Sequence, residues 1–221
     1  MTNQTTIIRE ADTAPGSFTT WLGRNHETMR KAARTRVALL IAGASLLASE
    51  ALQKLTVAAI CNRAGVAHGT FYLHFSDRNA LAGEVLRLLA DYLQAEMRAA
   101  ARLPGDATRN TTGAYMRLFE ENAGLMRCMV AGVDSFPQAQ AVFHALNHEW
   151  ASTVVRAARR HGGKVRSEAD LMRRAHALGG MVDQYLTALF VTGDPWITAL
   201  SQDREVVLDM FTDLWRKGMA P

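Results

Sequence analysis

The stretch from Leu55 to Leu81 constrains the fold of this chain more than any other part of its sequence. Thr56 is a hydroxyl residue suited to cap the N-terminus of a short helix over residues 56–63. Gly65 then supplies the glycine that a tight turn between two helices needs. A second short helix is predicted from about residue 68 to residue 75. The stretch therefore predicts two short helices joined by a glycine turn.

The second predicted helix has two different faces. Phe71 and Phe75, four residues apart, share one face and are expected to be core. The remaining faces carry hydrogen-bonding side chains, namely His68, Thr70, Tyr72 and His74. A short amphipathic helix with outward donors after a glycine turn is what a helix-turn-helix places in a DNA major groove. The alternative is a polar surface helix of an unrelated α-helical protein.

The residues that decide between these interpretations are A-G-V-A-H-G-T-F-Y-L-H-F, preceded by T-V-A-A-I-C and followed by S-D-R-N-A-L. This string closely resembles the DNA-binding signature of the TetR (tetracycline-repressor-type) family of transcriptional regulators. The resemblance is close from about Met29 to Val85 and only architectural beyond. It implies an all-α fold, with an N-terminal three-helix helix-turn-helix domain and a C-terminal helical bundle for ligand binding and dimerisation.

Three positions depart from the family pattern. Ala67 stands where the family usually has Ser or Thr capping the recognition helix, which should cost about 1 kcal/mol of capping and one phosphate-facing hydroxyl. Ala51 replaces the glycine usually found after the first helix, and Arg78-Asn79 replaces the commoner Lys followed by an acid. The phenyl rings and the turn glycine remain, so these departures bear on the phosphate contacts rather than on the fold.

The resemblance also implies which residues contact DNA. The positions of His68 and Thr70 face bases or phosphate in the family, and those of Tyr72 and His74 often clamp the DNA backbone. Thr56 can offer its hydroxyl and the N-terminus of its helix to a phosphate. The full predicted set is Arg30, Arg34, Lys54, Thr56, His68, Gly69, Thr70, Tyr72, His74 and Arg78. For any one of them the alternative is a solvated side chain.

The charge distribution supports a polyanionic partner at one end of the chain. Residues 1–80 contain nine Lys or Arg against five Asp or Glu, whereas residues 81–221 contain sixteen of each. The whole formal excess of +4 therefore lies in the segment with the helix-turn-helix. This is the electrostatic footprint of a protein whose N-terminal part meets nucleic acid.

Composition places the chain among ordinary globular proteins, with 48% hydrophobic and 21% charged residues. The first residues lack the apolar core of a signal peptide, and the longest apolar stretch, 39–48, is too short to span a bilayer. Cys61 and Cys128 in a chain without secretion features suggest reduced thiols. We therefore expect a cytoplasmic protein with no membrane partner, in which Cys61 has a packing role.

Helical periodicity predicts about nine helices and no strand. We expect a flexible extension over residues 1–25, the helix-turn-helix domain over 26–80, and the effector-binding and dimerisation domain over 81–221. The predicted helices cover about 28–48, 56–63, 68–75, 77–102, 108–122, 124–133, 137–161, 168–192 and 200–217. The fourth, about 38 Å long, would connect the two domains mechanically.

The C-terminal part carries scattered Met, aromatic and amide side chains that suit an adaptable small-molecule pocket. They are Phe119, Met126, Met129, Phe143, Asn147, Trp150, Met181, Gln184 and Tyr185. Ordinary core packing is the better interpretation for most of them individually. Gly179-Gly180 inside a predicted helix indicates either a close helix approach or space left for a ligand, because each glycine costs up to about 1 kcal/mol against alanine.

Two apolar faces near the C-terminus look too wide for packing on one side. The predicted dimer interface comprises Leu178, Val182, Leu189, Val207, Met210, Phe211, Leu214 and Trp215. Similar proteins of the family pair two such helices with their two-fold copies into a four-helix interface. The alternative is a monomer that buries both faces internally.

Neither a metal site nor a catalytic site is predicted, and no cofactor is expected. His144 and His148 lie four residues apart beside Glu149, but a third metal ligand at suitable spacing is missing. No nucleophile with an adjacent base and no phosphate-binding loop stands out. The predicted function is therefore a homodimeric repressor that binds a palindromic operator and is released by a small apolar or amphipathic effector. The alternatives are a helix-turn-helix regulator without an effector and an enzyme with an appended DNA reader.

Overall fold

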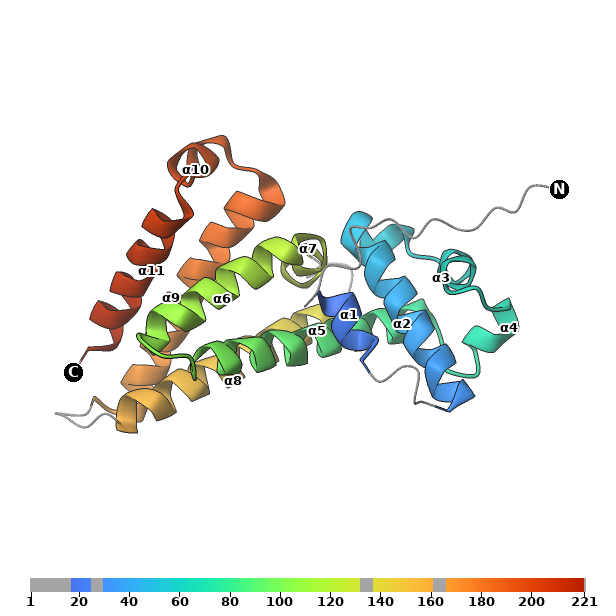
Figure 1. Cartoon of the computed structure of the whole chain (residues 1–221), viewed down its shortest axis with the longest axis horizontal. Coiled ribbons are helices and arrows are strands. Elements are labelled where there is room, and N and C mark those ends of the chain that lie inside the picture. Colours follow the sequence, from blue (N-terminus) through green and yellow to red (C-terminus); the bar gives the residue numbers. More distant parts are fainter. Residues whose placement is uncertain (1–16, 25–29, 132–136, 161–165, 221) are drawn as a thin grey trace. The chain divides into compact units, whose positions relative to one another are not determined.

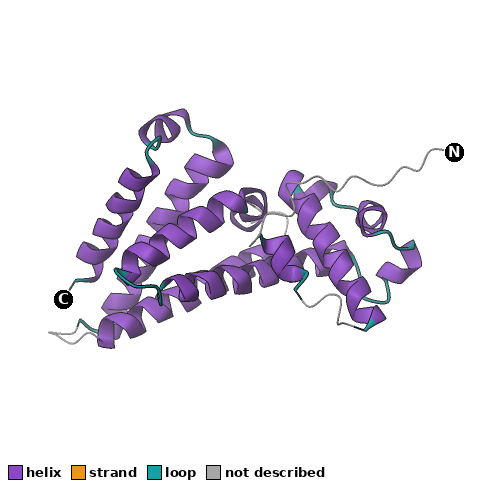
Figure 2. Cartoon of the chain, in the orientation of Figure 1, coloured by secondary structure: helices purple, strands orange, loops and turns teal. Residues whose placement is uncertain are grey.

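The computed structural model describes residues 17–24, 30–131, 137–160 and 166–220, which form helices and connecting loops without a strand (Figure 2). Eleven α-helices lie within these residues, rather than about nine. The chain divides into two compact units, one ending at Val85 and one beginning at Leu86. The boundary falls inside a continuous helix, α5 (Arg78–Ala100). The predicted domain boundary after residue 80 lies in the first turn of the same helix.

The first unit consists of short helices around one long helix. Its elements are α1 (Phe18–Leu22), α2 (Lys31–Ser49), a 3-10 turn (Leu52–Lys54), α3 (Val57–Ala64), α4 (His68–Phe71) and the first two turns of α5. Helix α1 corrects the sequence prediction, because a flexible extension was expected over 1–25. Phe18 and Leu22 are buried, so this part of the segment is packed structure. Residues 1–16 and 25 lie outside the described residues.

Helix α2 forms the centre of the first unit and packs against α1 and α3. Leu39, Leu40 and Leu47 are buried along its length. Gly43 allows a close approach to α5, because a Cβ there would lie 2.3 Å from Leu81 Cδ2. By length and composition α2 also meets the criteria for a membrane span. The central helix of a folded domain meets the same criteria, and the packing of α2 is that of such a helix.

The second unit contains the rest of α5 and six further helices (Figure 1). They are α6 (Ala107–Glu121), α7 (Ala123–Ala131), α8 (Pro137–Arg160), α9 (Glu168–Thr187), α10 (Pro195–Leu200) and α11 (Arg204–Met219), with a π-helical turn (Ala188–Thr192) extending α9. Helix α10 was not predicted, because the Asp194-Pro195 pair was interpreted as a break. The pair instead begins a helix, since Asp194 Oδ1 accepts hydrogen bonds from Trp196 N and Ile197 N.

Three helix pairs hold the second unit together. Helix α8 packs on α9, and α11 packs on both α6 and α9. Arg109 of α6 forms ion pairs with Glu205 and Asp209 of α11. Ala151, Val155, Leu171 and Ala175 form a buried cluster between α8 and α9, and Trp215 of α11 packs against it. This arrangement surrounds a cavity within the second unit.

Candidate nucleic-acid interface and a cavity in the second unit

The turn between α3 and α4 has the geometry that the sequence predicted. Thr56 Oγ1 accepts a hydrogen bond from Ala59 N at 3.1 Å and so caps α3. Gly65 adopts φ 67° and ψ 33°, a left-handed conformation that residues other than glycine rarely adopt. Val66 N donates to Cys61 O at 3.1 Å and closes the helix. Burial raises the pKa of the Cys61 thiol, which agrees with a packing role for this residue.

Helix α4 is shorter than the predicted helix over 68–75. It ends at Phe71, and the next residues form tight turns in which His74 N donates to Phe71 O at 2.9 Å. Ala67 stands at the N-cap and makes no side-chain hydrogen bond, so the expected loss of capping is confirmed. The missing cap helps to explain the short helix, because one N-terminal N–H of α4 has no side-chain acceptor.

The two phenyl rings anchor this segment, as predicted. Phe71 is fully buried and Phe75 is 5% exposed, with ring centroids 5.7 Å apart. Tyr72 stands on the other side, 54% exposed, and its ring lies 5.6 Å from that of His68. The recognition segment, a name we give to residues 67–75, therefore has a fixed inner face and a free outer face.

Leu73 is a feature of the outer face that the sequence reasoning missed. Its side chain is 80% exposed between Tyr72 and His74. An exposed leucine beside polar residues is positioned for apolar contact with thymine methyl groups or sugars. The sequence contains the signal, since Leu73 lies two residues from each phenylalanine and so points away from them.

Arg36 has an internal role in the first unit. Its Nη1 donates to His74 O at 3.0 Å, its Nη2 pairs with Glu84, and its Cζ lies 4.4 Å from the centroid of the Phe75 ring. The guanidinium therefore joins α2, α5 and the end of the recognition segment. The backbone of His74 is held, while its half-buried side chain remains on the surface.

Arg78 is also held within the first unit. Its Nη1 donates to Gln53 O at 3.2 Å and to Leu55 O at 2.5 Å. These bonds fix the loop before α3 and leave the remaining guanidinium donors for a phosphate, so the predicted contact stays a prediction. Arg30, Arg34 and Lys54 are exposed and form no ion pair with any other described residue. Every member of the predicted DNA-binding set is exposed or half-buried.

The second unit contains a cavity of about 780 Å³ bounded by residues of α5, α6, α8, α9 and α11. Of the nine predicted ligand-binding residues, Asn147 and Trp150 line it. Phe119, Met126 and Met129 are fully buried core residues instead. Phe143, Met181, Gln184 and Tyr185 also lie outside the cavity wall. A ligand contact by any of these seven stays a prediction, and core packing is the alternative that Met and aromatic side chains serve equally well.

Gly179 and Gly180 both line the cavity, and a Cβ on either would meet nothing within 4 Å. Of the two interpretations of this pair, the structure therefore supports space next to the helix rather than a close approach between helices. The missing side chains widen the cavity along α9.

A buried polar cluster in the cavity wall was not predicted. Tyr115 Oη donates to Asp183 Oδ1 at 2.6 Å, and Asn147 Nδ2 donates to Asp183 Oδ2 at 3.2 Å. All three residues line the cavity. Burial raises the pKa of Asp183 to about 6, although the two hydrogen bonds lower it. Burial and the neighbouring carboxylate raise the pKa of Tyr115 well above its usual value. The sequence signal was an acid four residues after Gly179 and three before Leu186, on a buried helix face.

The histidine pair of α8 lies on the surface of the second unit. His144 and His148 are exposed, and the His148 ring stacks on His176 of α9 at 5.8 Å. Among the described residues, no group of three or more His, Cys, Asp or Glu side chains could hold a metal ion.

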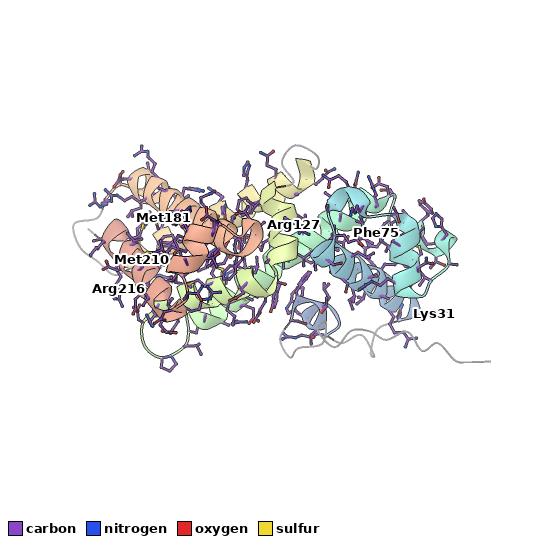
Figure 3. All side chains as sticks on the ribbon, turned by 90° about the horizontal axis from the view of Figure 1, so that it is seen from above. Lys31, Phe75, Arg127, Met181, Met210 and Arg216 are labelled. Atoms are coloured by element: carbon purple, nitrogen blue, oxygen red, sulfur yellow. The ribbon has the colours of Figure 1, made fainter. Side chains whose placement is uncertain are left out.

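Several residues predicted for the dimer interface are buried within the single chain. Val182, Leu189, Val207 and Phe211 are at most 8% exposed, and Trp215 belongs to the core cluster and the cavity wall. Met210 is 38% exposed on α11 (Figure 3), and Leu178 and Leu214 are half-buried. The exposed apolar surface lies instead on α10 and the start of α11, where Trp196, Leu200 and Val206 are 79%, 75% and 60% exposed.

Comparisons with known proteins agree with the geometry of both units. Residues 39–85 match the family model described as bacterial regulatory proteins, tetR family. The sequence has no significant match among curated proteins. Several solved structures, by contrast, are similar to this chain in fold.

A protein from Syntrophomonas wolfei described as a TetR-family transcriptional regulator is 14% identical, with a TM-score of 0.65 over 85% of this chain and 96% of that chain. A transcriptional regulator from Rhodococcus sp. is 22% identical, with a TM-score of 0.62 over 86% and 97%. The fatty acid degradation regulator FadR from Bacillus halodurans is 12% identical, with a TM-score of 0.63 over 84% and 95%. Residues 39–85 therefore carry the DNA-binding region of the TetR family, and the chain shares its fold with solved structures described as transcriptional regulators.

Proposed function

We propose that this regulator is a homodimeric repressor that binds a palindromic operator and leaves it when a small apolar or amphipathic molecule occupies the cavity of the second unit. The observation that carries the proposal is the recognition segment, with two buried phenyl rings beneath an exposed face of hydrogen-bonding side chains. Such a face reads base edges and positions phosphates in the major groove. The protein acts in the cytoplasm and has no enzymatic activity.

Dimerisation rests on the exposed apolar surface of α10 and α11. Four large apolar residues are exposed to solvent in the single chain, namely Trp196, Leu200, Val206 and Met210. Large apolar residues exposed on neighbouring segments are typical of a protein interface. Burying this surface against its two-fold copy would place two recognition segments on successive major grooves, about 34–36 Å apart.

The effector proposal rests on the cavity. A volume of about 780 Å³ lies in the range of small-molecule sites, and its wall combines apolar side chains, including two tryptophans and two methionines, with threonines and several charged residues. FadR of Bacillus halodurans, a protein of similar fold, is described as a fatty acid degradation regulator. A ligand with a substantial apolar body fits this cavity.

Helix α5 supplies the coupling between effector and DNA. The same helix begins with Arg78, which holds the loop before α3, and later contributes Met97 to the cavity wall. An effector that prefers one tilt of α5 changes the separation of the two recognition segments. A preference of about 1–3 kcal/mol is typical of such coupling.

Selection of DNA from a random duplex pool by the full chain tests the proposal. We expect an inverted repeat with half-sites one helical turn apart, and a protein of dimeric mass in sedimentation. A thermal-shift screen with small apolar ligands then tests the effector, since a stabilising ligand raises the melting temperature. A monomer, or a selected site without symmetry, would contradict the repressor model. DNA binding without any stabilising ligand would favour the regulator that has no effector.

A further inference from the structure

The buried carboxyl group of Asp183 lacks a counter-charge within the part of the chain that the structure describes. The residue is 8% exposed, and its two oxygens accept from the neutral donors Tyr115 Oη and Asn147 Nδ2. No ion pair to Asp183 exists among the described residues, although twelve ion pairs form elsewhere on them. An ionised carboxylate that is buried without a cation is strongly disfavoured.

Asp183 also keeps unused acceptor capacity. A carboxylate offers about four lone-pair positions, and the two donors occupy two of them. Because Asp183, Tyr115 and Asn147 all line the cavity, a ligand there can reach this cluster. Trp150, one helical turn after Asn147 on α8, lines the same cavity and offers an aromatic face that attracts cations. The wall around Asp183 is therefore suited to a positively charged group.

Three arginines, Arg160, Arg166 and Arg216, also line the cavity, and none of them forms an ion pair with Asp183 among the described residues. On α8, Asn147 and Arg160 both line the cavity and are separated by about 20 Å of helix rise. Arg216 pairs with Asp106, and Arg166 Nε donates to Ala220 O at 2.9 Å. These arginines have partners of their own, so they do not neutralise Asp183.

From this arrangement we propose that the effector is a lipophilic amine whose protonated nitrogen binds Asp183 while its apolar body extends along the cavity between α8 and α9. The proposal rests on the effector function proposed above and specifies its chemistry. Binding supplies the counter-charge that the folded chain lacks, and the two tryptophans and Val154 contact the apolar body. Gly179 and Gly180 leave room for that body beside α9.

Three probes of equal length test the head group. Decylamine, decanoate and decanol are titrated calorimetrically into the full chain. We expect decylamine to bind most tightly. Tighter binding of decanoate would overturn the proposal and point to the arginine end of the cavity, and equal binding of all three probes would also overturn it.

Variants then locate the contact. Asp183→Asn keeps the shape of the side chain and removes the charge, and we expect a loss of decylamine affinity of about 100-fold with little change for decanol. Tyr115→Phe keeps the carboxylate, so decylamine binding should remain and should show that the cluster tolerates substitution. Asp213→Asn removes an exposed acid of α11 and is the matched control. Unchanged decylamine affinity in Asp183→Asn would refute the assignment.

A DNA-binding readout separates this inference from the function on which it rests. If decylamine binds through Asp183 but does not release DNA, the repressor model fails and the amine site stands. If another ligand releases DNA equally well from the unmodified protein and from Asp183→Asn, the repressor model stands and the amine assignment fails.

Discussion

The recognition segment and the cavity of the second unit are built in opposite ways. The segment is continuous in sequence, and its turn, cap position and phenyl anchors all lie within residues 56–75. The cavity wall joins residues that are far apart, such as Asp106 and Arg216, separated by 110 positions. The residues of the proposed DNA-binding surface are therefore set by one local motif. The residues that line the cavity are set by how five helices pack together.

The largest expected effect tests whether the recognition segment depends on its buried rings. Phe71→Ala removes a fully buried side chain and should lower the free energy of unfolding by about 3–5 kcal/mol. Hydrogen exchange should show the lost protection in the first unit and not in α8 or α9. Equal loss of hydrogen-exchange protection in both units would mean that the recognition segment is not stabilised locally. Leu73→Ala is the control, because its side chain is exposed.

The next effect concerns the cavity and depends on pH. The pKa of Asp183 is about 6 in the folded chain and 3.8 in a model peptide, so the folded state binds the proton more tightly. Stability therefore falls as the pH rises from about 4 to about 6 and stays lower above that range. Asp183→Asn removes this cost, which amounts to at most about 3 kcal/mol.

Chemical denaturation of both proteins at pH 5 and pH 8 measures the effect. We expect the variant to gain stability over the unmodified chain at pH 8 and to gain roughly half as much at pH 5. An equal difference at both values would mean that Asp183 does not titrate in this range. The comparison of the two chains cancels contributions that both chains share.

Two cap substitutions should change the stability of the helix-turn-helix in opposite directions. Thr56→Ala removes the acceptor for Ala59 N and should cost about 1 kcal/mol. Ala67→Ser supplies the missing acceptor at α4 and should gain up to about 1 kcal/mol. Thermal unfolding measures both changes. If both substitutions shifted the melting temperature in the same direction, capping would not explain the short α4.

The smallest expected effect is the change in stability when a glycine in each unit is replaced by alanine. Gly179→Ala places a methyl group in open space and should stabilise α9 by about 0.5–1 kcal/mol, as measured by urea unfolding. Gly43→Ala is the matched test, because its Cβ meets the buried Leu81 side chain at 2.3 Å. We expect the second variant to be less stable than the unmodified chain. Destabilisation by Gly179→Ala would mean that the space beside α9 is filled.

Sequence reasoning anticipated most of the fold and the recognition segment. Thr56, Gly65, Phe71 and Phe75 encode the helix-turn-helix within one short stretch, so their roles follow from local rules of capping, turns and periodicity. The same rules missed α10, because Asp-Pro both ends and begins helices. Local rules also missed α1 and made the helix after Gly65 four residues too long.

The cavity was harder to predict for a physical reason. Met126 and Met129 are of the residue type expected in a flexible pocket, but both are fully buried. Asp183, whose carboxylate accepts a hydrogen bond from Tyr115, was not selected from the sequence. Which face of α9 borders a void depends on where α6 and α11 pack, and periodicity does not encode that choice. Gly179-Gly180 was the part of the cavity wall that the sequence could indicate. Two glycines destabilise a helix, and nothing in the neighbouring sequence explains their presence.

Operator binding by a double variant tests the central claim most directly. Thr70→Ala with Tyr72→Ala removes two side chains of the outer face and leaves both buried phenyl rings in place. Fluorescence anisotropy on the selected operator should show affinity lower by about 100-fold, because each such contact is worth about 1–3 kcal/mol. His144→Ala with His148→Ala, on exposed positions of α8, should bind as the unmodified chain does. Unchanged affinity of the Thr70 and Tyr72 variant would contradict the account.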